Sequence, residues 1–139
     1  MPDRRLLALL VAGSLAGGAL LAGCGGGDGG GTEVTLSAAG ERGRQVADDN
    51  GCFACHTTDG SKGTGPTWEG LYGSEVELKG GETVTADDAY LTNAILRARD
   101  ETVEGYANIM PVYEGKLTDE EVADLLAYLR DLAPEPTEG

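Results

Sequence analysis

The sequence predicts a small all-α domain with, at most, one short β-hairpin. Two amphipathic helices with N-terminal capping residues are expected at 85–98 and 118–132, in the second half of the chain. A weaker helix is expected at 37–49, and a long glycine-rich loop separates it from the other two. No alternation of strands and helices indicates a parallel sheet. With 139 residues, the chain has room for one small domain and little more.

Residues 1–23 have the pattern of an export signal. Two arginines precede an apolar stretch over 6–22 that is marginal for spanning a bilayer and contains several glycines. The stretch ends in LAGC at 21–24, which resembles the bacterial lipobox, where the cysteine receives a diacylglyceryl group and the chain is cut before it. We therefore expect a lipoprotein anchored through Cys24 on the outer face of the cytoplasmic membrane. Ordinary secretion and an uncleaved anchor are the alternatives.

The rest of the chain divides into a tether, a domain and a tail. The run GGGDGGG at 25–31 cannot form a packed element, so residues 24–37 are expected to be a flexible, lipidated tether. Its root-mean-square reach is roughly 20 Å. The folded domain is expected at 38–134, followed by a short C-terminal tail at 135–139.

The chain is strongly acidic, with a formal charge of −14 at pH 7. Loss of residues 1–23, which carry two arginines and one aspartate, changes this charge to −15. Nucleic acid is excluded as a partner because its phosphates would repel such a surface. Basic proteins are the favoured partners, although a merely solvated acidic surface also explains the composition.

The first helix and the loop after it contain most of the glycines that affect local structure. Gly40 and Gly43 weaken the helix at 37–49, and Gly43 is a candidate for a close crossing with another helix. Glycine and proline signals then recur over 57–84. Within this loop, VELKGGETV at 76–84 predicts a short hairpin around its Gly-Gly turn.

Two stronger helices follow, each with a cap and an apolar face. Thr85 is the predicted N-cap of the first, with Asp88 three residues on. Thr118 and Glu121 form a capping box for the second, which Pro134 ends. The apolar residues of the first helix are Leu91, Ala94, Ile95 and Ala98, and those of the second are Val122, Leu125, Leu126, Leu129 and Leu132. We interpret both faces as core.

The segment NGCFACHTTDG places Cys52, Cys55 and His56 within five positions of a chain that has three cysteines and one histidine. Structural zinc needs four ligands, and only Cys24 remains, across the tether. A thioredoxin-like pair needs a βαβ unit, which the pattern does not indicate. A simple disulfide is the plainest alternative. Haem attachment is favoured, because two thiols at this spacing can add to the haem vinyl groups and the adjacent imidazole can then bind iron.

Met110 is the predicted sixth ligand of that iron. The other methionine is Met1, the initiator, which leaves with the export signal. Met110 lies in a loop between the two stronger helices, and Pro111 stiffens the backbone beside it. A methionine at such a position is poorly placed to fill a core.

Four segments carry a family resemblance: GCFACHTTDGSKGTGPTWEGLYGSEV, VTADDAYLTNAI, VEGYANIMPVY and LTDEEVADLLAYLRDL. They resemble a class I c-type cytochrome and, more narrowly, the cytochrome c domain fused to subunit II of some bacterial haem–copper terminal oxidases. The likeness runs from about 38 to 132. It implies one covalently bound haem c, crossing N- and C-terminal helices, and a third helix packed against the haem. It also implies contact of Gly43 and Val46 with the 128–129 region.

The resemblance further implies a ligand set and a pocket. The Pro66 carbonyl would accept the Nδ1–H of His56, and Trp68 or Tyr72 would donate to a haem propionate. The residues expected to bind the haem are Cys52, Cys55, His56, Pro66, Trp68, Leu71, Tyr72, Tyr106, Ile109 and Met110, with His56 and Met110 as iron ligands.

Two departures from the oxidase subunit stand out. That subunit also carries a copper-binding domain, and this chain has no cysteines or histidines to spare for one. The segment LRARDETVEGY at 96–106 lacks the proline that such domains often have before Gly-Tyr. We expect a membrane-tethered monohaem cytochrome, not an enzyme, that transfers single electrons to or within a respiratory oxidase. The expected partner is a membrane oxidase or reductase complex with a basic docking surface. A haem-based gas sensor and a permanently bound oxidase subunit are the alternatives.

Overall fold

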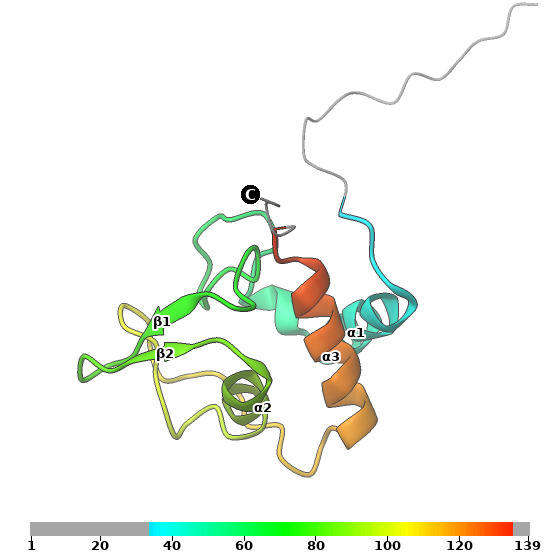
Figure 1. The fold of residues 1–139 in the computed structure, drawn as a ribbon. Coiled ribbons are helices and arrows are strands. Elements are labelled where there is room, and N and C mark those ends of the chain that lie inside the picture. Colours follow the sequence, from blue (N-terminus) through cyan, green and yellow to red (C-terminus); the bar gives the residue numbers. More distant parts are fainter. Residues whose placement is uncertain (1–33, 135–139) are drawn as a thin grey trace, which may run out of the picture. The chain divides into compact units, whose positions relative to one another are not determined.

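The computed structural model describes residues 34–134, which form three α-helices, one 3₁₀ turn and a two-stranded antiparallel sheet (Figure 1). This confirms the predicted small, mostly helical fold. In chain order the elements are α1 (Ala38–Asp49), the 3₁₀ turn η1 (Cys52–Ala54), β1 (Glu75–Glu77), β2 (Thr83–Thr85), α2 (Asp88–Leu96) and α3 (Asp119–Asp131). Both α1 and α2 pack against α3.

Gly43 allows the close crossing of α1 and α3, as expected. A Cβ built on Gly43 would lie 2.5 Å from the carbonyl carbon of Asp124 and 2.9 Å from the Cβ of Tyr128. Carbon atoms normally pack at about 3.5–4.0 Å, so a residue with a side chain does not fit at this separation. Val46, expected at the same contact, is partly buried and packs against the core.

Polar side chains also join the same two helices, one pair beside the crossing point and another at the start of α1 and the end of α3. The Arg42 guanidinium donates from Nε and Nη2 to the two carboxylate oxygens of Asp124, at 2.8 and 2.7 Å. The backbone N–H and the hydroxyl of Ser37 each donate to Oδ2 of Asp131 at 2.8 Å. Hydrogen bonds of this fork-like kind fix the orientation of the two helices as well as their contact.

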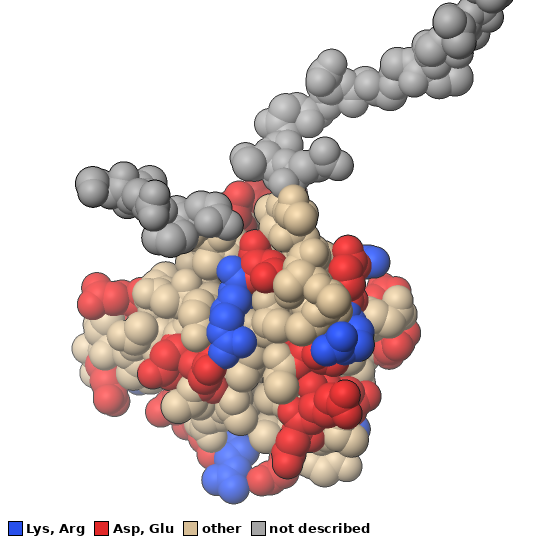
Figure 2. Space-filling view, turned by 45° about the vertical axis from the view of Figure 1, so that its right-hand side comes forward, with Lys and Arg blue, Asp and Glu red and all other residues tan. Residues whose placement is uncertain are grey.

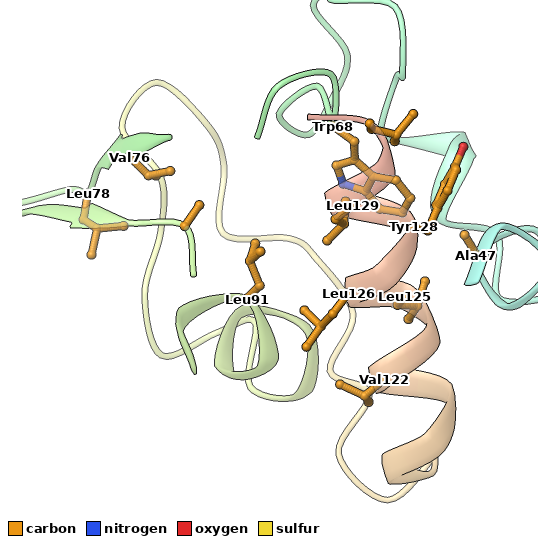
Figure 3. Packing of buried hydrophobic residues seen from close by; sticks show 12 residues of the cluster. Ala47, Trp68, Val76, Leu78, Leu91, Val122, Leu125, Leu126, Tyr128 and Leu129 are labelled. Atoms are coloured by element: carbon orange, nitrogen blue, oxygen red, sulfur yellow. The ribbon is translucent and has the colours of Figure 1, made fainter. Parts of the chain in front are cut away.

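The core lies between α3, α2, the hairpin and the loop that follows η1. Figure 3 shows Leu126 of α3 pointing toward α2 and Leu91 of α2 pointing away from its own helix, with Trp68 lying near Leu129. All five apolar residues predicted for α3 are buried: Val122, Leu125, Leu126, Leu129 and Leu132. Of the apolar residues predicted for α2, Leu91 is buried, whereas Ala94 and Ile95 are partly buried. Ala98 is buried although α2 ends before it.

Of the two predicted helix starts, the structure confirms one and corrects the other. Thr118 and Glu121 form the expected capping box at the start of α3. The N-cap of α2, however, is Asp87, whose side chain accepts from the backbone N–H of Tyr90, and the prediction of Thr85 was wrong. Thr85 instead ends β2, where it pairs with Glu75, so its backbone is committed to the sheet.

The predicted hairpin is present, and it extends by pairing with a distant segment. Its strands pair with Val76 opposite Val84, and both glycines of the turn, Gly80 and Gly81, have positive φ angles of 112° and 86°. Residues 102–104 then lie alongside β1. The backbone N–H of Lys79 donates to the Thr102 carbonyl, and the backbone N–H of Glu104 donates to the Glu77 carbonyl, each at 2.8 Å. The segment at 96–106, which lacks the proline before Gly-Tyr, is thus held by backbone hydrogen bonds. One of them uses the N–H of Glu104, which a proline at this position would not have.

No helix within residues 34–134 is long and apolar enough to cross a membrane. The expected export signal at 1–23, the lipidation site Cys24, most of the tether and the tail at 135–139 lie outside the described residues.

Candidate functional site

The cysteine motif follows α1 through one residue in the left-handed region. Gly51 has φ 69°, which turns the chain directly from the end of α1 into η1. The backbone N–H groups of Cys55 and His56 both donate to the Cys52 carbonyl, at 3.1 and 3.0 Å. This single tight turn brings both thiols and the imidazole to one wall of a cavity. Both thiols are free and partly exposed.

His56 is held with one ring nitrogen committed to the protein. Its Nδ1 lies 2.7 Å from the Pro66 carbonyl oxygen, which can only accept, so Nδ1 carries the proton of the neutral ring. Burial lowers the pKa of His56, and the hydrogen bond to Pro66 opposes this shift. The neutral form leaves the lone pair on Nε2, and a neutral imidazole is the form that binds a metal ion.

Trp68 and Gly65 set the position of the imidazole ring. The Trp68 indole stacks on it, with ring centroids 5.0 Å apart and an angle of 25° between planes. A Cβ built on Gly65 would lie between 2.6 and 3.0 Å from three ring atoms of His56, so a side chain there would displace the ring. From the sequence, Gly65 is predicted only as one of the loop residues in 57–84. Gly65 lies directly before Pro66, whose carbonyl accepts from His56, and this position is the sequence signal that could have identified its role.

A cavity of about 760 Å³ opens beside this histidine. Its volume is in the range typical of ligand-binding pockets, about 300–1,000 Å³. Nine of the ten residues expected to bind the haem line it: Cys52, Cys55, His56, Pro66, Trp68, Leu71, Tyr106, Ile109 and Met110. Their haem contacts themselves stay predictions.

Tyr72 is the tenth residue, and it does not line this cavity. Its hydroxyl donates to Oδ1 of Asp88 at 2.9 Å, and the guanidinium of Arg130 lies 5.0 Å from its ring centroid. Arg130 also donates to Asp88. The arrangement therefore does not support Tyr72 as a haem contact or as a donor to a propionate. Its polar neighbours come from α2 and α3, which the local sequence around Tyr72 could not reveal.

The segment that contains Met110 is attached to the rest of the site from two sides. The backbone N–H of Glu114 donates to the Leu96 carbonyl at 3.0 Å, beyond the last turn of α2. The Tyr113 hydroxyl donates to the Asn50 carbonyl at 3.1 Å, just before the cysteine motif. Tyr113 is buried and lines the cavity, and the sequence analysis missed it.

The geometry bears on the alternatives for the cysteine motif. Within residues 34–134 no group of three or more His, Cys, Asp or Glu side chains is arranged to hold a metal ion, which disfavours zinc. Cys52 and Cys55 are not bonded to each other. The motif also follows a helix and precedes a loop, unlike the cysteine pair of a βαβ unit.

Two free thiols, a neutral histidine and a large, mostly apolar cavity together define a haem-binding class of protein. The sequence profile of the family Cytochrome c matches residues 40–133, most of the chain. The protein therefore belongs to the cytochrome c family, whose members bind haem c covalently and transfer electrons with it. A comparison with individually curated proteins found no match.

The residues of the site fit haem c. Cys52 and Cys55 are free to form two thioethers, and the apolar lining suits the porphyrin. His56 offers Nε2 to iron because Nδ1 is bound to Pro66. When bound, haem c supplies an iron that gains or loses one electron. The chain holds and orients the group and, through its apolar residues, limits the access of water to it.

Proposed function

We propose that this protein is a lipid-anchored monohaem cytochrome c that passes single electrons within a respiratory chain, to a terminal oxidase. His56 is proposed as the proximal iron ligand and Met110 as the distal one. The observation that carries the proposal is that both residues line the same cavity as the two haem-attaching thiols. A pair of fixed axial ligands suits electron transfer, because it leaves no open coordination position for a substrate or gas.

The ligand pair also favours one oxidation state. Axial methionine raises the reduction potential relative to two nitrogen ligands, and an apolar pocket disfavours the extra positive charge of ferric iron. Leu71, Leu91 and Leu129 contribute to such a lining. We therefore expect a protein that accepts electrons readily and delivers them to an acceptor of still higher potential, such as an oxidase.

The membrane anchor and the oxidase rest on sequence features. Cys24 lies in a lipobox-like segment, and the tether that follows would keep the domain within roughly 20 Å of its attachment point. The resemblance to the cytochrome c domain of oxidase subunit II favours an oxidase as the acceptor. On these grounds we place the protein on the outer face of the cytoplasmic membrane.

The charge of the surface supports a basic partner. Acidic side chains are scattered over the face seen in Figure 2 and are not gathered in one patch. The cavity lining itself includes five exposed glutamates: Glu69, Glu75, Glu77, Glu101 and Glu104. Redox encounters are small and weak, so opposite charge on the partner acts mainly on the rate of association.

The test is the oxidation of reduced, haem-loaded protein by membranes that contain the native oxidase, followed by stopped flow as salt is raised. We expect the second-order rate to fall with salt, because the Debye length is about 10 Å at 0.1 M. The double variant Glu101→Gln, Glu104→Gln should weaken this dependence. Its control, Asp48→Asn with Glu82→Gln, makes the same charge change outside the cavity lining.

Three results would contradict parts of the proposal. A rate that is flat in salt removes the role of charge and favours apolar docking. If membranes that contain the oxidase do not oxidise the reduced protein, the oxidase is not its acceptor. A first-order rate that is independent of protein concentration favours a fixed subunit over a mobile carrier.

A further inference from the structure

Arg99 is hydrogen-bonded to the backbone of Met110. The Arg99 Nε donates to the Met110 carbonyl oxygen at 2.9 Å. In the opposite direction, Nδ2 of Asn108 donates to the Arg99 carbonyl at 3.1 Å. In each of the two bonds a side chain donates to a backbone carbonyl. Together they join Arg99 to the segment just before Pro111.

These two bonds attach residues 107–112 to the fold, and the bonds of Tyr113 and Glu114 attach the chain directly after them. Within the described part of the chain, no other hydrogen bond joins residues 107–112 to the rest of the fold. The one further backbone bond in this segment, from Ile109 to the Ala107 carbonyl, is internal to it. Pro111 has no N–H to contribute, and residues 107–109 and 111 are exposed, so only Met110 and Val112 of this segment are partly buried.

We propose that Arg99 is a positioning residue for Met110: it holds the segment so that the methionine stays on the iron. This inference rests on the proposed ligation by Met110. Arg99 itself follows α2, which packs on α3, so the hydrogen bond ties the segment to the helical core. The donor is charged but the bond is exposed to water, so we expect it to contribute as much as an ordinary hydrogen bond.

Arg44 on α1 provides a matched control. Its Nε donates to Oε2 of Glu41 at 3.2 Å, and both side chains are at least half exposed. Arg44 therefore has the same charge as Arg99 and is also exposed, but it lies outside the cavity lining and is not hydrogen-bonded to Met110. Exposed ion pairs of this kind contribute little to stability.

The experiment uses haem-loaded ferric protein and measures two quantities that a general loss of stability would not move selectively. One is the weak far-red absorption band of sulfur–iron ligation. The other is the rate at which excess imidazole replaces the methionine, a rate set by how often the sulfur leaves the iron. Arg99→Met should speed imidazole binding roughly tenfold and weaken the band, whereas Arg44→Met should match wild type. Arg99→Lys, which keeps a charged donor, should restore part of the effect.

Met110→Ala separates failure of this inference from failure of the ligand assignment. If Met110→Ala leaves the band intact, Met110 is not the ligand and the proposed function loses its axial pair. If Met110→Ala abolishes the band but Arg99→Met behaves like Arg44→Met, only the positioning role is overturned. Should Arg99→Met fail to fold, Asn108→Ala removes the second bond alone and is expected to speed imidazole binding as well. Unchanged imidazole binding in Asn108→Ala would then overturn the positioning role.

Discussion

Replacing Gly43 by alanine tests whether the crossing of α1 and α3 is as tight as the structure describes. The new Cβ would lie 2.5 Å from the carbonyl carbon of Asp124, where about 3.5 Å is normal, so the helices must separate by about 1 Å. Overpacking of a close contact costs about 1–3 kcal/mol, and the contacted atoms are backbone, which cannot rotate away. Alanine recovers about 1 kcal/mol in helix propensity. We expect a net loss of about 1 kcal/mol in unfolding free energy.

Gly40→Ala is the matched control on the same helix. A Cβ there would lie 3.0 Å from Cγ of Asp131 and 3.3 Å from Oγ of Ser37, both side-chain atoms that can move. Moving them breaks the Ser37–Asp131 hydrogen bonds, which contribute on the order of 1 kcal/mol. The gain in helix propensity offsets this loss, so the net change should be near zero.

The assay is denaturant unfolding of haem-loaded protein, monitored by circular dichroism, with the slope against denaturant compared between variants. Separation of the helices would also move η1, which follows α1 directly, so the haem absorption of Gly43→Ala should change as well. If Gly43→Ala proves as stable as Gly40→Ala, the reasoning on the crossing fails.

Two further changes test the polar contacts of α3. Arg42→Met should destabilise the fold more than Asp124→Asn does. It leaves the Asp124 carboxylate, which is only 7% exposed, without its partner, whereas Arg42 without Asp124 is hydrated. Equal losses of unfolding free energy in the two variants would contradict this. Thr118→Ala removes the N-cap and should cost about 1 kcal/mol. Hydrogen bonds from the backbone N–H and the hydroxyl of Thr118 hold the pKa of the Glu121 side chain below its ordinary 4.5. The ionised carboxylate therefore stabilises the fold above that pH. This contribution is lost as the pH falls through the lowered pKa. The gap between wild type and Thr118→Ala should therefore be larger at pH 7 than at about pH 3, and a gap that is independent of pH would refute the linkage.

Several features were predictable from the sequence because they depend on neighbours along the chain. The capping box of Thr118 and Glu121 spans four positions, and the buried stripe of α3 follows the helical repeat. The cysteine motif needs only one turn of backbone to bring Cys52, Cys55 and His56 to one wall.

The family resemblance supplied contacts that the residues alone did not indicate. The hydrogen bond between His56 and Pro66 spans ten residues of loop, and the contact of Gly43 with Tyr128 joins opposite ends of the domain. Nothing in local propensity or periodicity identifies such pairs, although a shared fold does.

Other features were decided by the tertiary structure. Thr85 and Asp87 are both acceptable caps in the sequence, and the pairing of Thr85 with Glu75 across the hairpin left Asp87 to begin α2. Tyr72 was expected at the haem, yet Asp88 is the acceptor for its hydroxyl.

The sequence by itself thus determined that three helices form and that Cys52, Cys55 and His56 lie together, because short-range hydrogen bonds and the helical repeat depend on neighbouring residues. The tertiary structure decided which polar side chains meet, as when Arg99 reaches the carbonyl of Met110. Exposed polar residues follow no periodicity, and their partners are chosen only when distant segments pack together.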